Sequence, residues 1–171
     1  MTRWLSRRIA ATLSLTALAL SLTQVATAAP PTPVEAEVIE LPAGLGCQFP
    51  LTVSATDGVV REVKFLDEDG DEVRVISVGT GISYTYTNVT TGESVTTKAS
   101  GSAKSTVTNP DGTVTVTATG HNGLIMFPGD IPAGPTTTVY QGRIVYTIDA
   151  SGVWTLLSTS GKSRDICAEL A

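Results

Sequence analysis

Side chains that carry enzyme chemistry are scarce in this sequence. Its 171 residues include one histidine, His121, and two cysteines, Cys47 and Cys167. Any Ser-His-Asp, Cys-His or histidine-rich metal site must therefore use His121 or form without a histidine. The G-x-S-x-G and H-E-x-x-H patterns of many hydrolases are also absent. The sequence accordingly predicts no catalytic residue and no cofactor.

His121 and the acidic residues are the remaining candidates for catalysis. His121 lies in the stretch Gly120-His-Asn-Gly123, where polar residues are common for backbone reasons alone, so we predict a turn residue. Most acidic residues also lie in predicted turns, and Glu62 is the one that is clearly mid-strand, near Lys64. An enzyme that uses acidic residues or His121 at the mouth of a barrel stays open as an alternative.

Basic residues are few, and three of the eleven lie at the N-terminus, at Arg3, Arg7 and Arg8. An apolar run over residues 9–22 follows, and then the small-x-small site Ala26-Thr27-Ala28. This order predicts a secretory signal peptide over residues 1–28. The apolar run is shorter than the roughly 20 residues of a bilayer span, and no later stretch approaches that length. We therefore expect a secreted, extracellular protein with no integral membrane segment after processing.

The charge balance limits the possible partners. Removing three arginines leaves 11 − 3 = 8 basic and 16 acidic side chains, so the net charge of the mature chain becomes 8 − 16 = −8. Nucleic acids and anionic membrane surfaces both require basic patches, and none is visible. Neither is expected as a partner.

The two cysteines divide the exported chain. In an oxidising compartment they are most simply explained by one disulfide, between Cys47 and Cys167. Residues 29–46 contain four prolines and three glutamates and predict an extended leader, with a conditional strand over residues 34–41. The domain proper is expected over residues 47–171.

Alternation with a period of two dominates the domain. Residues 106–118 place two Thr/Val runs on either side of Asn109-Pro110-Asp111-Gly112, which predicts a β-hairpin. After the signal peptide, no segment of ten or more residues has the helical i, i+3, i+4 pattern. We predict one all-β domain, an antiparallel up-and-down meander of about ten strands, with a β-barrel favoured over a β-sandwich. The expected strands are 51–55, 59–66, 73–78, 82–87, 94–98, 102–108, 113–118, 136–149, 153–158 and 163–167.

Two groups of residues are candidate binding sites. Asp67, Asp69 and Asp71 lie in an acidic loop that is similar to a calcium loop, but the expected glycine and final acid are missing, so we predict no metal site there. An aromatic set shares strand faces with aliphatic residues and is predicted as core. Its members could instead line a ligand cavity or form a carbohydrate platform. The set comprises Tyr84, Tyr86, Tyr140, Tyr146 and Trp154.

The chain resembles a known group of proteins. The likeness rests on the signal peptide, the acidic mature chain and three stretches: Cys47-Gln-Phe-Pro-Leu-Thr-Val53, Gly120-His-Asn-Gly-Leu-Ile-Met-Phe127 and Ser163-Arg-Asp-Ile-Cys167. Together they look like small exported proteins of high-GC Gram-positive bacteria. That group has no assigned activity, so the resemblance implies export and names no reaction.

These observations favour a secreted, non-catalytic β-domain that acts by binding a protein or surface partner. The alternative within the same class is a calyx-type carrier of a small apolar ligand. The alternative from another class is the enzyme described above.

The secreted protein should begin at Ala29, because Ala26 and Ala28 place small side chains where signal peptidase needs them. Intact-mass spectrometry of protein from the culture medium checks this. A species in the medium that retains residues 1–22 would contradict the export argument.

Overall fold

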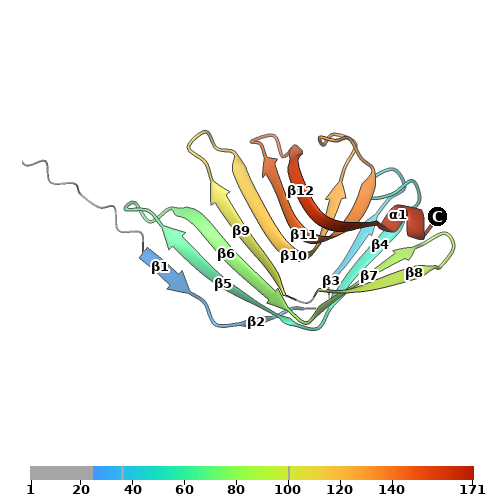
Figure 1. Cartoon of the computed structure of the whole chain (residues 1–171), viewed down its shortest axis with the longest axis horizontal. Coiled ribbons are helices and arrows are strands. Elements are labelled where there is room, and N and C mark those ends of the chain that lie inside the picture. The colour runs from blue at the N-terminus through green and yellow to red at the C-terminus, as the bar shows by residue number, and fades with distance from the viewer. Residues whose placement is uncertain (1–24, 36, 100) are drawn as a thin grey trace, which may run out of the picture.

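A computed structural model describes residues 25–35, 37–99 and 101–171. The expected signal peptide lies outside the described residues, apart from its last four. Within these ranges the chain forms twelve strands and one short helix (Figure 1). The elements are β1 Val25–Ala28, β2 Thr32–Pro33, β3 Glu37–Leu41, β4 Leu51–Thr56, β5 Val59–Leu66, β6 Glu72–Thr80, β7 Ile82–Asn88, β8 Ser94–Ala99, β9 Ser102–Thr108, β10 Val114–Met126, β11 Thr136–Ile148, β12 Trp154–Asp165 and α1 Ile166–Glu169.

The strands form two antiparallel sheets. The eight-stranded sheet has the order β1-β5-β6-β9-β10-β11-β12, with β2 also paired to β5, and the four-stranded sheet has the order β3-β4-β7-β8. β4 continues into β5, β6 into β7 and β8 into β9 within two residues, so each of these stretches passes from one sheet into the other. The predicted all-β, antiparallel class is confirmed. Among the described residues no strand ladder joins β12 to β1.

Glycines with positive φ mark the level at which the long strands change direction. In Figure 1 the two sheets meet at this level and open away from it like the arms of a V. Gly120 (φ +86°) is an instructive case, because a Cβ built there would lie 2.1 Å from the carbonyl oxygen of Gly101. Only glycine fits, since both the conformation and the close approach exclude a side chain. We call this set the glycine bend: Gly58, Gly81, Gly101, Gly120, Gly142 and Gly161.

Two turns predicted from the sequence are wrong, because glycines of the glycine bend lie inside continuous strands. Residues 120–123 and 160–162 were expected to be turns, but they lie inside β10 and β12, whose ladders with β11 continue through them. Gly120 pairs with Gly142, and His121 pairs with Gln141. His121 is therefore a strand residue. The reason is that positive φ at one glycine can bend a strand without ending its pairing.

Part of the Pro/Glu-rich leader joins the sheets. β2 lies against the start of β5, and β3 pairs with β4 over residues 37–41. The expected conditional strand over 34–41 corresponds to β3. β1, which precedes the expected cleavage site, pairs with residues 63–66 of β5.

Two clusters of buried residues form the core. The first joins β4, β7, β11 and α1 and contains Cys47, Leu51, Val53, Tyr86, Val139, Ile166 and Leu170. The second lies on β10 and β11 and contains Val116, Ala118, Leu124, Met126, Ile144 and Tyr146. The buried Asp130 ties the irregular loop after β10 to the start of β12, because its carboxylate accepts hydrogen bonds from the backbone N–H groups of Phe127 and Trp154.

The predicted disulfide between Cys47 and Cys167 is present, with a Cα–Cα distance of 5.5 Å. It ties the β3–β4 connection to α1, and the two cysteines are 120 positions apart in sequence. On the chain-entropy model a loop of this size stabilises the fold by about 4–5 kcal/mol.

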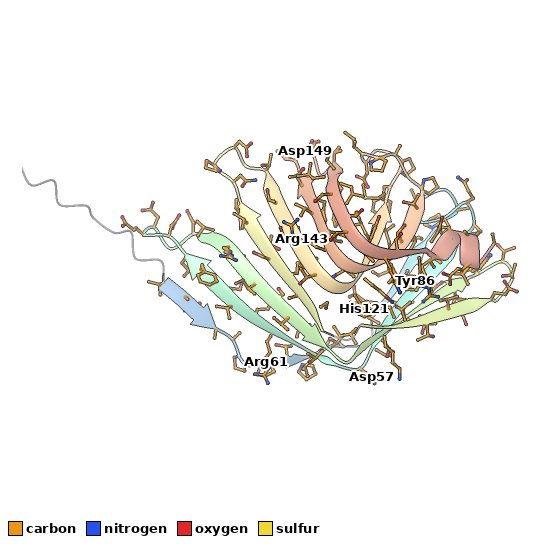
Figure 2. All side chains as sticks on the ribbon, viewed as in Figure 1. Asp57, Arg61, Tyr86, His121, Arg143 and Asp149 are labelled. Carbon is orange, nitrogen blue, oxygen red and sulfur yellow. A yellow bond between two sulfur atoms is a disulfide. The ribbon has the colours of Figure 1, made fainter. Side chains whose placement is uncertain are left out.

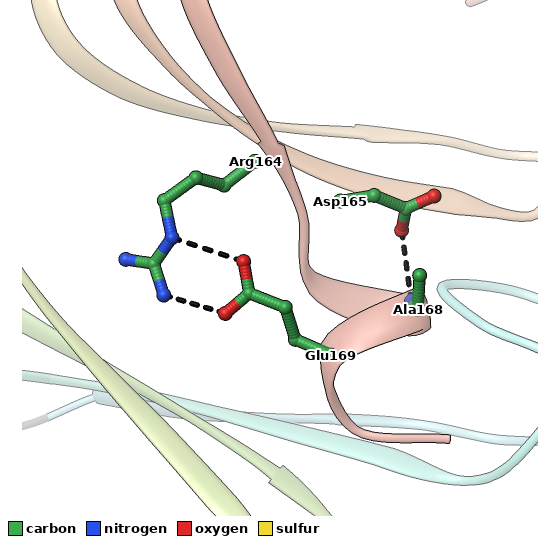
Figure 3. A network of polar contacts seen from close by, with 4 residues as sticks. All are labelled: Arg164, Asp165, Ala168 and Glu169. Atoms are coloured by element: carbon green, nitrogen blue, oxygen red, sulfur yellow. Dashed lines mark hydrogen bonds and ion pairs between the residues drawn. The ribbon is translucent and has the colours of Figure 1, made fainter.

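The short helix α1 is held at both ends. The Asp165 carboxylate accepts a hydrogen bond of 3.0 Å from the Ala168 N–H at its start. Arg164 forms a two-pronged ion pair with Glu169 (Figure 3). These contacts hold the helical turn that carries Cys167, while Ile166 and Leu170 anchor the same segment in the first core cluster.

Gly120→Ala tests the glycine bend, with Gly112→Ala as the matched control on the preceding hairpin turn. Both glycines have similar φ values, +86° and +82°, but a Cβ at Gly112 meets nothing within 4 Å. The control should lose about 1 kcal/mol of unfolding free energy through backbone strain alone. Gly120→Ala should lose more than about 3 kcal/mol because the backbone must also move. Urea unfolding checks this, and equal losses would contradict the steric argument.

Candidate functional site

A cavity of about 480 Å³ lies between the two sheets, on the inner side of the glycine bend. Residues from β3 to β7 and from β9 to β11 line it. A smaller cavity of about 290 Å³ shares five of its lining residues and extends to Val34 and Glu37. Tyr86 and His121, both lining the larger cavity, are labelled in Figure 2. The exposed side chains of Ile39 and Lys104 mark where the cavity meets solvent.

One wall of the cavity is apolar and aromatic. Along β7, Ile82, Tyr84 and Tyr86 line the cavity, whereas the alternate Ser83, Thr85 and Thr87 do not, because successive side chains of a strand point to opposite faces. Tyr86 is paired with Val53 of β4, which is in turn paired with Ile39 of β3. The strict alternation of the sequence therefore produces a continuous apolar wall across three strands.

The facing wall is polar and is built by β5, β6 and β9. Glu62, Ser77 and Lys104 stand in register across these strands. The Ser77 hydroxyl donates a 2.8 Å hydrogen bond to the Glu62 carboxylate. Gly79 pairs with Ser102 in the next row, and a Cβ at Gly79 would meet Ser102 and Ile82 at 3.0 Å. The absence of a side chain at Gly79 therefore leaves space inside the cavity.

Tyr86 spans the gap between the sheets. Its side chain is 3% exposed, and a Cβ at Gly123 of β10 would lie 2.6 Å from its hydroxyl oxygen. Gly123 thus makes room for the phenol. Burial raises the pKa of Tyr86 to about 12, the neighbouring Tyr84 adds to the rise, and a hydrogen bond with Thr97 opposes it.

The other two cavity tyrosines are also shifted. Burial raises the pKa of Tyr84 most, and the negative charge of Glu37 raises it further. Burial alone raises the pKa of Tyr146. All three phenols are therefore neutral at physiological pH, with their rings available for apolar contact.

The predicted aromatic set is divided by the structure. Tyr84, Tyr86 and Tyr146 line the cavity. Tyr140 and Trp154 pack against the second core cluster instead. Trp154 stacks on Tyr146 with ring centroids 4.8 Å apart, so it supports a lining residue from behind. Tyr86 and Tyr146 are each at most 8% exposed, which makes them both core residues and cavity walls.

Sequence reasoning missed the polar wall. Ser77, Ser102 and Lys104 were not candidates, because each looks like an ordinary polar position on an alternating strand. Glu62 stood out as the mid-strand acid but had no assigned role. Only the pairing register of β5, β6 and β9 brings these side chains together.

The acidic loop is organised by its own hydrogen bonds. The Asp67 carboxylate accepts from the backbone N–H groups of Asp69 and Asp71, at 3.1 and 2.8 Å. All three aspartates are exposed. In the described part of the chain no group of three or more His, Cys, Asp or Glu side chains is placed to hold a metal ion.

Comparison of the chain with models of protein families, with curated proteins and with solved structures finds no match in any of the three. The described ranges contain no helix that is long and apolar enough to cross a bilayer.

The buried phenol predicts a stability change at high pH. The folded pKa of Tyr86 is about 12, against about 10 in an unfolded chain. Its contribution to stability is therefore complete below pH 10 and is lost as the pH rises toward 12. Unfolding free energies measured between pH 9 and about 11.5 should fall less steeply in Tyr86→Phe than in the original protein. Identical slopes would show that this phenol is not protected from ionisation.

Proposed function

We propose that this protein is an exported, non-catalytic binding protein that holds a small, largely apolar molecule in the cavity between its sheets. The observation that carries the proposal is the cavity itself. Its volume of about 480 Å³ falls within the range of about 300–1,000 Å³ typical of small-molecule sites. Its walls combine tyrosines and aliphatic side chains with a few convergent polar groups, which is the usual composition of such sites.

The same geometry supports binding over nucleophilic catalysis. Both cysteines are joined in the disulfide, so neither provides a thiolate. The Glu62 carboxylate is held by the Ser77 hydroxyl. The glycine bend supplies the curvature that a calyx requires. We also propose that closure of the strands into a barrel is one way to seal the cavity.

An enzyme remains the second candidate, because His121 and Glu62 line the same cavity. An imidazole and a carboxylate in one cavity can divide the roles of general acid and general base. In that case a screen against esters and glycosides should find turnover that His121→Ala abolishes.

Export and membership of the high-GC Gram-positive group are further parts of the proposal, and binding of a protein or surface partner is the alternative to a small ligand. The disulfide supports export, because such bonds persist in oxidising compartments. A protein or surface partner would bind without filling the cavity, so a variant that blocks the cavity distinguishes it from a small ligand.

Ile39→Trp and Val38→Trp form a matched pair for this test. Ile39 lines both cavities, whereas its neighbour Val38 lines neither and is 59% exposed. Binding of the neutral fluorescent dye N-phenylnaphthylamine should be saturable. Ile39→Trp should weaken it about tenfold or more by filling the cavity mouth, and Val38→Trp should leave it unchanged.

Circular dichroism should first establish that both variants fold. Equal dye affinity in the two variants would place the dye elsewhere and overturn the proposal. Native mass spectrometry of protein purified without denaturant then looks for a small molecule that co-purifies with the original chain and is lost from Ile39→Trp.

A further inference from the structure

We propose that the preferred ligand is an organic cation with an apolar body, whose positive group is held by Glu62 and the cavity tyrosines. The inference rests on the proposed function and adds the charge of the ligand to it. It follows from the charges that line the cavity, from the tyrosines among its lining residues and from the pairing of one lining carboxylate with a neutral hydroxyl.

Glu62 is a half-buried carboxylate inside the cavity. Its oxygen Oε1 accepts the Ser77 hydroxyl at 2.8 Å, which is a neutral partner. The ion pairs of the described residues join Lys64 to Glu72 and Arg164 to Glu169, and neither pair includes Glu62. A partly buried carboxylate gains from a partner of opposite charge. A ligand cation supplies that partner.

The tyrosines add to the negative potential. Tyr84 and Tyr86 come from β7 and Tyr146 from β11, so their rings approach the cavity from different strands. The face of an aromatic ring attracts ammonium groups, and several rings together form the usual site for quaternary ammonium ligands. Neutral phenols also provide apolar surface for the body of the ligand. The cavity therefore matches a molecule that is both apolar and positively charged.

The charge balance of the lining favours a cation over an anion. Glu62 lines the larger cavity and Glu37 lines the smaller one that joins it, whereas Lys104 provides the single ammonium. Lys104 is exposed and stands on β9, one strand beyond Ser77. His121 also lines the larger cavity, and it adds a positive charge only when it is protonated. Two carboxylates and three tyrosines thus line the joined cavities beside one lysine.

Three probes with chains of ten carbon atoms test the charge preference: decyltrimethylammonium, decanol and decanoate, each used below its micelle concentration or solubility limit. Each is measured by displacement of N-phenylnaphthylamine from the full exported chain. Decyltrimethylammonium should bind about fivefold or more tightly than decanol, and decanoate should bind most weakly. Equal affinities, or a preference for decanoate, would overturn the inference.

Glu62→Gln and Glu68→Gln form the matched pair of variants. Both remove one negative charge, but Glu68 lies in the exposed acidic loop, and the glutamine at 62 can still accept the Ser77 hydroxyl. Glu62→Gln should abolish most of the preference for the cation and leave decanol binding unchanged. Glu68→Gln should change neither. If both variants weaken the preference for the cation equally, the preference comes from the overall surface charge and not from Glu62.

Lys104→Gln separates the two possible signs of the ligand. Removing the ammonium should strengthen binding of decyltrimethylammonium or leave it unchanged. If Lys104→Gln instead loses decanoate binding, and the original protein does not prefer the cation, the site binds anions. If dye and decanol bind but the cation has no advantage, this inference fails while the proposed cavity function stands. If neither dye nor any decyl probe binds, both fail.

Discussion

The bend of the long strands depends on a steric constraint: at one level of the sheets a side chain has no space. Backbone atoms from neighbouring strands approach within 2.1 Å of the position that a Cβ of Gly120 would occupy, and within 2.2 Å at Gly161. Glycine therefore allows two strands to cross this level in contact with each other. Because the bends lie side by side in adjacent strands, the strands all change direction at one level, and the meander is divided into two arms that diverge from it. The arms in turn define an inner side with a cavity.

The bend also explains why the two walls of the cavity differ in character. β4 and β7 lie on one side of it and direct Val53, Tyr84 and Tyr86 inward, where they continue the first core cluster. β5, β6 and β9 lie on the other side and contribute Glu62, Ser77 and Lys104. The apolar wall is stabilised by burial, whereas the polar wall is tolerated because it faces open space. A separation of this kind matches the ligand that we propose, with a polar end and an apolar body.

Local chemistry in the sequence was enough to predict part of this fold. The turn at Asn109-Pro110-Asp111-Gly112 forms as expected: Gly112 has φ +82°, and the Asp111 carboxylate accepts from Thr113, which lowers the pKa of Asp111. The disulfide followed from cysteine count and compartment. The sequence predicts turns at Gly120 and Gly161, because a glycine that bends a paired strand has the same sequence neighbours as a glycine at which a strand ends. The polar wall could not be predicted, since the register that aligns Glu62 with Ser77 and Lys104 depends on contacts between distant residues.

The position of the disulfide bears on how the chain responds to proteolysis. The exposed tips at residues 67–71, 89–92, 110–112 and 149–152 all lie between Cys47 and Cys167 in sequence. Exposed tips of this kind are the usual sites of proteolytic nicking. A single cut at any of them breaks the backbone but leaves both pieces covalently joined through the sulfur atoms. The pieces stay at high effective concentration, so the sheets can remain paired. Release of a fragment then requires a second cut or a reductant.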